Sequence, residues 1–351
     1  MELVVSLLSL SPHEGAEQKT LISGLREKSD IIVTNGTQVV ESSTALIIML
    51  QSFPPGINPT GLAVVLSLQA EVLPQTAFVS FFSICKQFLM NSTAEDLKFV
   101  KEEITSISHK LVSISCQIGQ PRAAINMIKQ IIPLYGVADT CLTPAHADLL
   151  QACIAGQMYS YAVDFLRCLD IFEINSTDTN LKCEDFLKFF YYSGICYIAV
   201  KDYEAALASF DQCISAPANA LSHIVICALK KAKLVSLISP GRALIISSGT
   251  SSTVSRYCKT KMPVYDPIVA ASTANKREDL LRAIAEGQET LLADGNWGIA
   301  KQVLEAATKH CIARLSKTFL TLPLAGVAAR ADLAHAATTS SSGSGSGIPS
   351  S

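Results

Sequence analysis

The side chains best suited to acid–base or metal chemistry are spread thinly along the chain. The histidines show neither a His-x-His pair with a distant acid nor a His-Glu-x-x-His motif, the spacings that would gather zinc ligands. One histidine lies beside a cysteine, but adjacent residues of a helix point about 100° apart and do not form a base–nucleophile pair. We therefore predict that the chain is not an enzyme and holds no metal or cofactor. The six histidines are His13, His109, His146, His223, His310 and His335.

Eleven cysteines are present, an odd number. No two of them have the Cys-x-x-Cys spacing of a zinc or redox site, and many lie in apolar, helix-like patterns. We expect them to be small core residues in a reducing compartment rather than a disulfide framework. Those in helical patterns are Cys85, Cys116, Cys153, Cys196, Cys213 and Cys227.

Charge is low and nearly balanced, with 28 basic and 30 acidic residues and a net charge of -2. This excludes a general nucleic-acid or acidic-membrane binder, and no apolar run reaches the roughly 18 residues of a membrane span. The densest basic cluster is Lys230, Lys231 and Lys233. We interpret it as a solvated helix face, with an acidic protein partner or nucleic acid as alternatives. Hydrophobic residues make up 49% of the chain, which suggests apolar surface covered by partners.

Apolar residues recur at steps of three or four between residues 95 and 117, which predicts an amphipathic helix. Ser92 and Glu95 have the spacing of a capping box before it. Gly119 ends this helix, and a proline suits the first turn of the next helix, at 121–134. The apolar stripe consists of Leu97, Val100, Ile104, Ile107, Leu111, Ile114 and Cys116.

Two further helix starts carry recognisable signals. Thr143 before Pro144 predicts a hydroxyl cap followed by a proline at the first helical position. A long helix is expected at 295–315, with Asn296 as its cap.

Short turns repeat at a spacing of about 37 to 45 residues, the period of helix-hairpin solenoids. Each contains or precedes a small residue that lets the next helix pack closely. In the third hairpin, Gly194 and Ala206 match the small crossing positions of the tetratricopeptide pattern. We expect ordinary helix packing there, since no basic concave groove for a peptide is evident. The turns begin at Gly119, Gly156, Lys201 and Pro240.

Segments that are rich in glycine, proline or small polar residues predict loops at 50–61 and 171–184. Residues 334–351 predict a disordered Ser/Gly-rich tail. The first residues, MELVVSLL, are interpreted as a helix rather than a signal sequence.

Four stretches carry a pattern shared with known proteins. They are LTPAHADL at 142–149; FFYYSG at 189–194 with KDYE at 201–204; APA at 216–218 with SHI at 222–224 and KKAKLVSLI at 230–238; and IARLSKTFLTL at 312–322. Across residues 90 to 333 the chain resembles the PCI-domain scaffolds of the proteasome lid, COP9 signalosome and translation initiation. The second and third stretches resemble the signalosome's subunit 3 family within that group.

The resemblance implies an all-α fold, a right-handed solenoid of tetratricopeptide-like helical hairpins followed by a PCI-type winged helix. It implies a non-catalytic scaffold subunit of the COP9 signalosome, in the cytoplasm and nucleus, whose partners are the other subunits. The assembled particle removes Nedd8 from cullins and so regulates cullin-RING ubiquitin ligases. The chemistry of that protein deneddylation belongs to another subunit, a zinc isopeptidase.

The end of the chain departs from the family pattern. Residues 323–327, PLAGV, lack the serine cap and the acid that start the winged-domain helix, and no wing hairpin follows Leu333. We therefore expect a truncated winged helix. The resemblance implies N-terminal repeats at 1–184 and a PCI region at 185–333.

The residues expected to mediate assembly lie mostly in one short apolar segment. Burying a single Leu or Phe is worth about 1.5–3 kcal/mol, so four of them left in water would forgo roughly 6–12 kcal/mol. The candidates are Lys317, Thr318, Phe319, Leu320, Leu322 and Leu324, with Tyr203, Phe210 and His223 as packing residues of the last solenoid turns.

Three alternatives remain at this point. The first is a PCI scaffold of another complex, of the proteasome-lid type. The second is a tetratricopeptide-like adaptor that binds a peptide tail. The third is a winged helix that binds nucleic acid, with affinity that falls steeply with salt.

Overall fold

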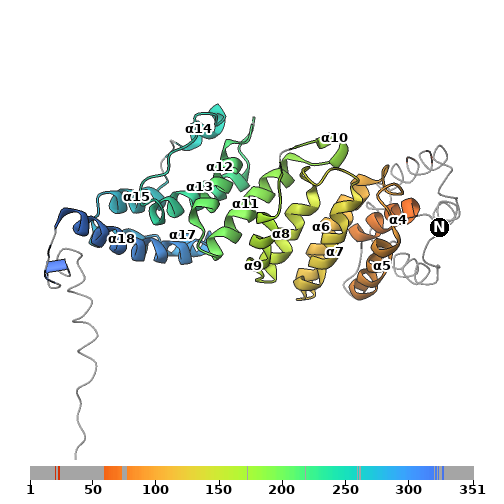
Figure 1. Cartoon of the computed structure of the whole chain (residues 1–351), viewed down its shortest axis with the longest axis horizontal. Coiled ribbons are helices and arrows are strands. Elements are labelled where there is room, and N and C mark those ends of the chain that lie inside the picture. Colours follow the sequence, from red (N-terminus) through yellow and green to blue (C-terminus); the bar gives the residue numbers. More distant parts are fainter. Residues whose placement is uncertain are drawn as a thin grey trace, which may run out of the picture. The chain divides into compact units, whose positions relative to one another are not determined.

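The computed structural model describes residues 59–72, 77–171, 173–217, 219–258, 260, 262–319, 321, 323 and 326–327, together with residues 20 and 23. In these ranges the regular structure is helical, and the one strand-like feature is an isolated parallel bridge between Cys141 and Glu173 (Figure 1). The predicted all-α helical-repeat fold is therefore confirmed. The chain divides into two compact units, residues 1–200 and residues 201–351.

Unit 1 is a row of helices in which sequence neighbours pack side by side. Helix α8 packs on α7 and α11, and α6 packs on α4, α7 and α8. The helices are α4 (Pro59–Val72), α5 (Phe78–Asn91), α6 (Lys101–Gln117), α7 (Pro121–Leu134), α8 (Pro144–Ala155), α9 (Tyr159–Arg167), α10 (Ser176–Thr179) and α11 (Cys183–Ala199).

Unit 2 is organised around α13, which packs on α12, α15 and α18. Helix α16 packs on both α15 and α18. The helices are α12 (Tyr203–Ser215), α13 (His223–Ile238), α14 (Ser252–Cys258), α15 (Tyr265–Thr273), α16 (Arg277–Glu286), α17 (Gln288–Ala293) and α18 (Trp297–Thr318).

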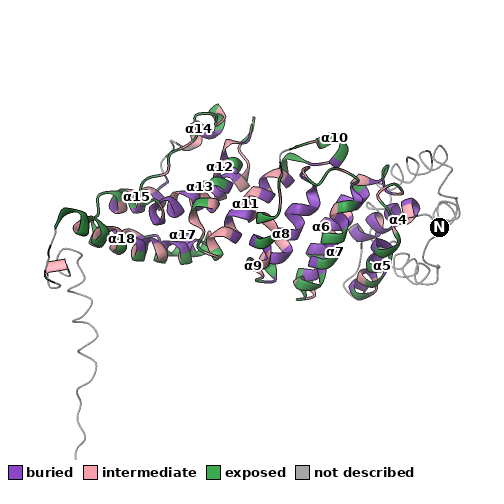
Figure 2. Ribbon diagram, viewed as in Figure 1, coloured by how far each residue is buried: buried purple, intermediate pink, exposed green. Residues whose placement is uncertain are grey.

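The core of unit 1 is one continuous cluster of buried apolar side chains that extends from α4 to α11. Its buried residues are purple along α6, α7 and α8 in Figure 2. The predicted stripe from Leu97 to Ile114 is buried throughout, which confirms its helical periodicity as a packing signal. Cys116 was assigned to the same stripe and is exposed, so that assignment is wrong.

Helix α6 begins later than its apolar pattern suggests. It starts at Lys101, because residues 94–99 form turns rather than helix. The reciprocal side-chain cap falls one residue after the predicted pair: Asp96 Oδ2 accepts hydrogen bonds from Thr93 N at 3.2 Å and from Thr93 Oγ1 at 2.6 Å. Ser92 instead donates to the carbonyl oxygen of Phe88 at 2.7 Å and closes the end of α5.

Both predicted loops contain helix. Residues 59–61 form the first turn of α4, and residues 50–58 lie outside the described residues. In the segment 171–184, Asn175 accepts a hydrogen bond from the Asp178 backbone N–H at 3.2 Å and caps the short helix α10. The predicted tail at 334–351 and the first-helix prediction also lie outside the described residues.

Left-handed backbone recurs at the first three predicted turns. Gly119 has φ of 75°, Gln157 has 55° and Lys201 has 63°, each two residues beyond the end of a helix. This is the position where helices commonly end with a left-handed residue. The fourth predicted turn, at Pro240, is wrong as a hairpin turn, because the next helix begins only at Ser252. The sequence-based boundary at 184/185 is not tested by the division into compact units and stays a prediction.

A single methyl group at Gly287 should test the packing of unit 2. An added Cβ there would lie 2.5 Å from Val264 Cγ1 and 3.2 Å from the Ala283 carbonyl oxygen, whereas one at Gly298 meets nothing within 4 Å. We expect Gly287→Ala to lower the free energy of unfolding by about 1–3 kcal/mol through overpacking. Gly298→Ala should raise it by up to about 1 kcal/mol through helix propensity. Urea unfolding followed by circular dichroism measures both, and equal stabilities would contradict the described packing.

Candidate assembly site

Each of the three lysines in the basic cluster of α13 pairs with another side chain of the same unit. Lys230 Nζ lies 2.8 Å from both carboxylate oxygens of Asp294. Lys231 Nζ donates to Asn296 Oδ1 at 2.6 Å, and its side chain is buried. Lys233 Nζ donates to Asp266 Oδ1 at 2.6 Å. The prediction of a solvated helix face is therefore wrong, and all three ammonium groups are already paired.

Tyr265 connects the pairs of Lys230 and Lys231 into one network. Its hydroxyl donates to Asp294 Oδ2 at 2.6 Å and accepts a hydrogen bond from Asn296 Nδ2 at 2.8 Å. Asn296 occupies the N-cap position of α18, but its side chain caps nothing there, because it is engaged with Lys231 and Tyr265. The network joins α13 to α15 and to the turn between α17 and α18.

The network shifts the pKa values of its members. Burial lowers the pKa of Lys231 and raises that of Tyr265. Burial alone would raise the pKa of Asp294, but hydrogen bonds from Lys230 and Tyr265 and the charge of Lys230 lower it below its ordinary value. These groups form hydrogen bonds and ion pairs with one another. The arrangement therefore stabilises the fold of unit 2 rather than offering a reactive side chain.

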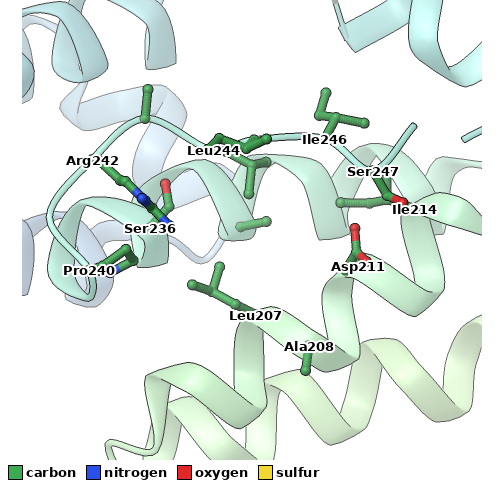
Figure 3. Close-up of a pocket in the computed structure, with 13 residues that line it drawn as sticks. Leu207, Ala208, Asp211, Ile214, Ser236, Pro240, Arg242, Leu244, Ile246 and Ser247 are labelled. Carbon is green, nitrogen blue, oxygen red and sulfur yellow. The ribbon is translucent and has the colours of Figure 1, made fainter. Parts of the chain in front are cut away.

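An apolar pocket of unit 2 lies between α12, α13 and the segment 240–247 (Figure 3). Its volume is about 320 Å³. Leu207 and Ala208 of α12 form one wall, and Leu244 of the overlying segment faces them. Asp211 is the acidic group of the lining, and it accepts a hydrogen bond from Ser215 Oγ at 3.4 Å. The other polar side chains of the lining are Arg242, Ser236 and Ser247, so Asp211 has no second acid or base in the lining with which to form a catalytic pair.

The structure places the predicted packing residues at separate points of unit 2. Tyr203 donates from its hydroxyl to Gln302 Oε1 at 2.8 Å and so links α12 to α18. Phe210 is fully buried in α12. His223 is exposed at the start of α13, with Nε2 at 3.4 Å from Cys227 Sγ. His223 and Cys227 are four residues apart in the sequence, a spacing that places both on one face of a helix and indicates this thiol–imidazole pair, although it was not predicted above.

The histidine that lies beside a cysteine, His310, contacts the backbone of another helix. His310 Nε2 lies 2.9 Å from the carbonyl oxygen of Ile238, near the end of α13, and Cys311 follows it on α18. His146 is buried, and its Nδ1 accepts a hydrogen bond from the Thr143 backbone N–H at 3.1 Å, so it serves as a polar packing residue at the start of α8. Over the described ranges, no cluster of three potential metal ligands occurs and no helix is long and apolar enough to span a membrane.

The C-terminal half of α18 is one of the exposed apolar features of unit 2, besides Ile245, Leu281 and Leu292. The helix is buried at Ile299, Ala300, Val303 and Ala306. Beyond Cys311 its turns are exposed on nearly every side, and Ile312 and Phe319 are 40% and 37% exposed. Among the predicted assembly residues, Lys317 and Thr318 are also exposed. Leu320, Leu322 and Leu324 lie outside the described residues.

Asp294 should be the group on which the lysine network depends. We expect Asp294→Asn to lower the free energy of unfolding at neutral pH by about 1–3 kcal/mol, because Lys230 loses its negative partner and the amide keeps only one of the two acceptor oxygens that Lys230 and Tyr265 share. The Asp294 pKa is lower in the folded chain than in the unfolded chain, so its stabilisation is present above the unfolded pKa and is lost as pH falls through the folded pKa. The difference in free energy of unfolding between Asp294→Asn and the wild type should therefore become smaller at acidic pH.

The matched control is Asp279→Asn. Asp279 makes only surface pairs, at 3.6 Å to Arg282 and 3.7 Å to Lys276, and should contribute less than about 1 kcal/mol. Urea unfolding between neutral and acidic pH compares the two variants. If Asp294→Asn lowers the free energy of unfolding no more than Asp279→Asn does, the network is not important for stability.

Comparisons with known proteins agree with these features. Residues 17–254 match the family model "COP9 signalosome complex subunit 3, N-terminal helical repeats". The chain is 33% identical over 273 residues to COP9 signalosome complex subunit 3 of Drosophila melanogaster, covering 74% of this chain and 61% of that protein. It is 29% identical over 258 residues to the protein of the same name in Dictyostelium discoideum, covering 73% of this chain and 62% of that protein.

The chain thus spans about three fifths of the length of these curated relatives. The family match covers more than half of the chain, including α4 to α13 and the turns that repeat between them. The chain therefore belongs to the COP9 signalosome subunit 3 family, through its N-terminal helical repeats.

Proposed function

We propose that the chain is a non-catalytic scaffold subunit of a COP9 signalosome, and that it supports removal of Nedd8 from cullins. By this proposal, its partners are the other subunits of the particle, and its link to cullin-RING ubiquitin ligases is indirect. Its place of action would be the cytoplasm and nucleus. The family membership and the names of the two relatives support the assembly role.

One observation carries the proposal, namely the uncovered end of α18. Ile312 and Phe319 keep a substantial part of their apolar surface in water, although apolar neighbours cover the first half of the same helix. An exposed apolar helix end of this kind marks a surface that another protein can bury. It coincides with the stretch that resembles the start of the family's winged-helix region, where subunits of PCI complexes meet.

The polar chemistry of the described residues also fits a scaffold. The lysines that could have bound an acidic partner or nucleic acid are paired with Asp294, Asn296 and Asp266. By the proposal, the catalytic step of deneddylation belongs to a different subunit, as the family resemblance implies. The role of this chain would be to hold that subunit and its neighbours in position.

The test is Phe319→Asp in the full chain. Placing a charge on this apolar surface should weaken association with the other signalosome subunits at least about tenfold, equivalent to about 1.4 kcal/mol. Helical circular dichroism should stay nearly unchanged, because Phe319 is not part of the buried core. Co-sedimentation with reconstituted subunits measures the association. Nedd8 release from a cullin by the reconstituted particle measures the consequence.

Ser316→Asp is the matched control. Ser316 is exposed in the last turn of α18, three residues before Phe319, and donates to the Ala313 carbonyl oxygen, so the variant adds the same charge without removing apolar surface. It should co-sediment as the wild type does. Unchanged co-sedimentation of Phe319→Asp would refute the assembly surface. Co-purification with proteasome particles in place of the cullin-deneddylating particle would favour the proteasome-lid alternative.

A further inference from the structure

A histidine in unit 1 joins three helices through two carboxylates. His109, on α6, places Nδ1 at 2.8 and 2.9 Å from the two carboxylate oxygens of Asp148, on α8. Its Nε2 lies 3.5 Å from Asp185 Oδ1, on α11. Both aspartates are buried, at 3% and 2% exposure, whereas the histidine side chain is 37% exposed and open to protons from solvent.

The geometry decides which form of the imidazole fits. Carboxylates only accept hydrogen bonds, and a neutral imidazole carries a hydrogen on just one of its two ring nitrogens. If Nδ1 holds that hydrogen and donates to Asp148, the lone pair of Nε2 points toward Asp185. Only the protonated ring has a hydrogen on each side, and only it brings a positive charge to two buried negative ones.

The neighbouring groups do not replace this charge. Ser108 Oγ donates to Asp148 Oδ2 at 2.5 Å, and the Lys182 backbone N–H donates to Asp185 Oδ2 at 3.3 Å. Both donors are uncharged, so neither bond brings a positive charge to the aspartates.

Lys188, one turn along α11, is paired with Glu184 at 2.7 Å, and its charge acts on Asp185 and His109 without an ion pair to either aspartate being formed in the described contacts. From α7, Tyr135 faces the cluster as a buried phenol that donates to or accepts from Thr105 Oγ1. Tyr192 of α11 is a second phenol near Asp148 and Lys188. The imidazolium is thus the cation that directly contacts both aspartates.

We propose that His109, Asp148 and Asp185 form a proton-dependent joint that fastens α6 to α8 and α11. With the proton bound, both ring nitrogens hold carboxylates and the three helices are tied together. When the proton leaves, the contact to Asp185 turns repulsive and two buried carboxylates lose their counter-charge. The joint makes the packing of the last helix of unit 1 sensitive to pH near neutrality.

The direction of the effect follows from linkage. Burial alone would lower the pKa of His109, but the hydrogen bond to Asp148 and the charges of Asp148 and Asp185 raise it above its ordinary value of 6.5. A group whose pKa is higher in the folded state stabilises fully below its unfolded pKa. That stabilisation is lost as pH rises through the folded value, so unit 1 should weaken on the alkaline side of neutral.

Nuclear magnetic resonance on the full chain tests the joint directly. In protein with ¹⁵N-labelled histidine, the imidazole signal that disappears in His109→Gln identifies His109. We expect it to titrate above 6.5 and to show hydrogens on both ring nitrogens at lower pH. Asp185→Asn removes one anion and should lower the pKa of His109. This shift also identifies the signal if His109→Gln fails to fold. A His109 pKa at or below 6.5 would overturn the proposal.

Thermal unfolding supplies the second readout. Between about pH 6 and about pH 8.5, where histidines titrate, the melting temperature of the wild type should fall more steeply with rising pH than that of His109→Gln. His223→Gln is the matched control, because His223 is an exposed histidine of unit 2 outside the joint, and its slope should equal that of the wild type. Equal slopes for the wild type and His109→Gln would also overturn the proposal.

Discussion

A helical hairpin cannot bury its apolar face alone, and this constraint organises the chain. Each helix of unit 1 covers the apolar face of its neighbour, so the buried residues merge into one cluster from α4 to α11. Leu97, Ile107 and Ile128 each lose nearly all contact with water, and each such burial contributes about 1.5–3 kcal/mol. The contacts between neighbouring helices therefore stabilise the row, as is typical of repeat architectures.

Polar side chains inside such a row must find partners, because an unpaired buried polar group is destabilising. In unit 2, Lys231 reaches Asn296 and Tyr265 bridges Asn296 and Asp294. In unit 1, Asp148 reaches His109 and Ser108. These bonds lie where helices distant in sequence meet. They fix which helices are neighbours, whereas apolar packing alone tolerates several arrangements.

The sequence predicted local features well, because helical period, caps and turn residues act within a few positions. The apolar stripe of α6, the proline start of α7 at Pro121 and the Thr143 start of α8 were visible in this way. The partners of Lys230 and Lys231 were not, since Asp294 and Asn296 lie more than sixty residues away in the chain. The same separation misled the cap assignment of Asn296, whose side chain serves a distant lysine. Of the candidate assembly site, sequence reasoning identified the segment around Phe319 through a resemblance, and its exposure required the structure.

The end of α18 shows how a helix can continue without tertiary support. Starting a helix is costly, but each further residue adds one backbone hydrogen bond, so a helix begun by buried turns extends readily. Residues after Cys311 follow the packed turns at Ile299 and Val303 in this way. Such an extension holds Ile312 on a preformed helix and Phe319 directly after its end, and a partner would bury them without first ordering that helix. Binding to such a preformed helix costs less conformational entropy, because the backbone is already ordered when the subunit folds.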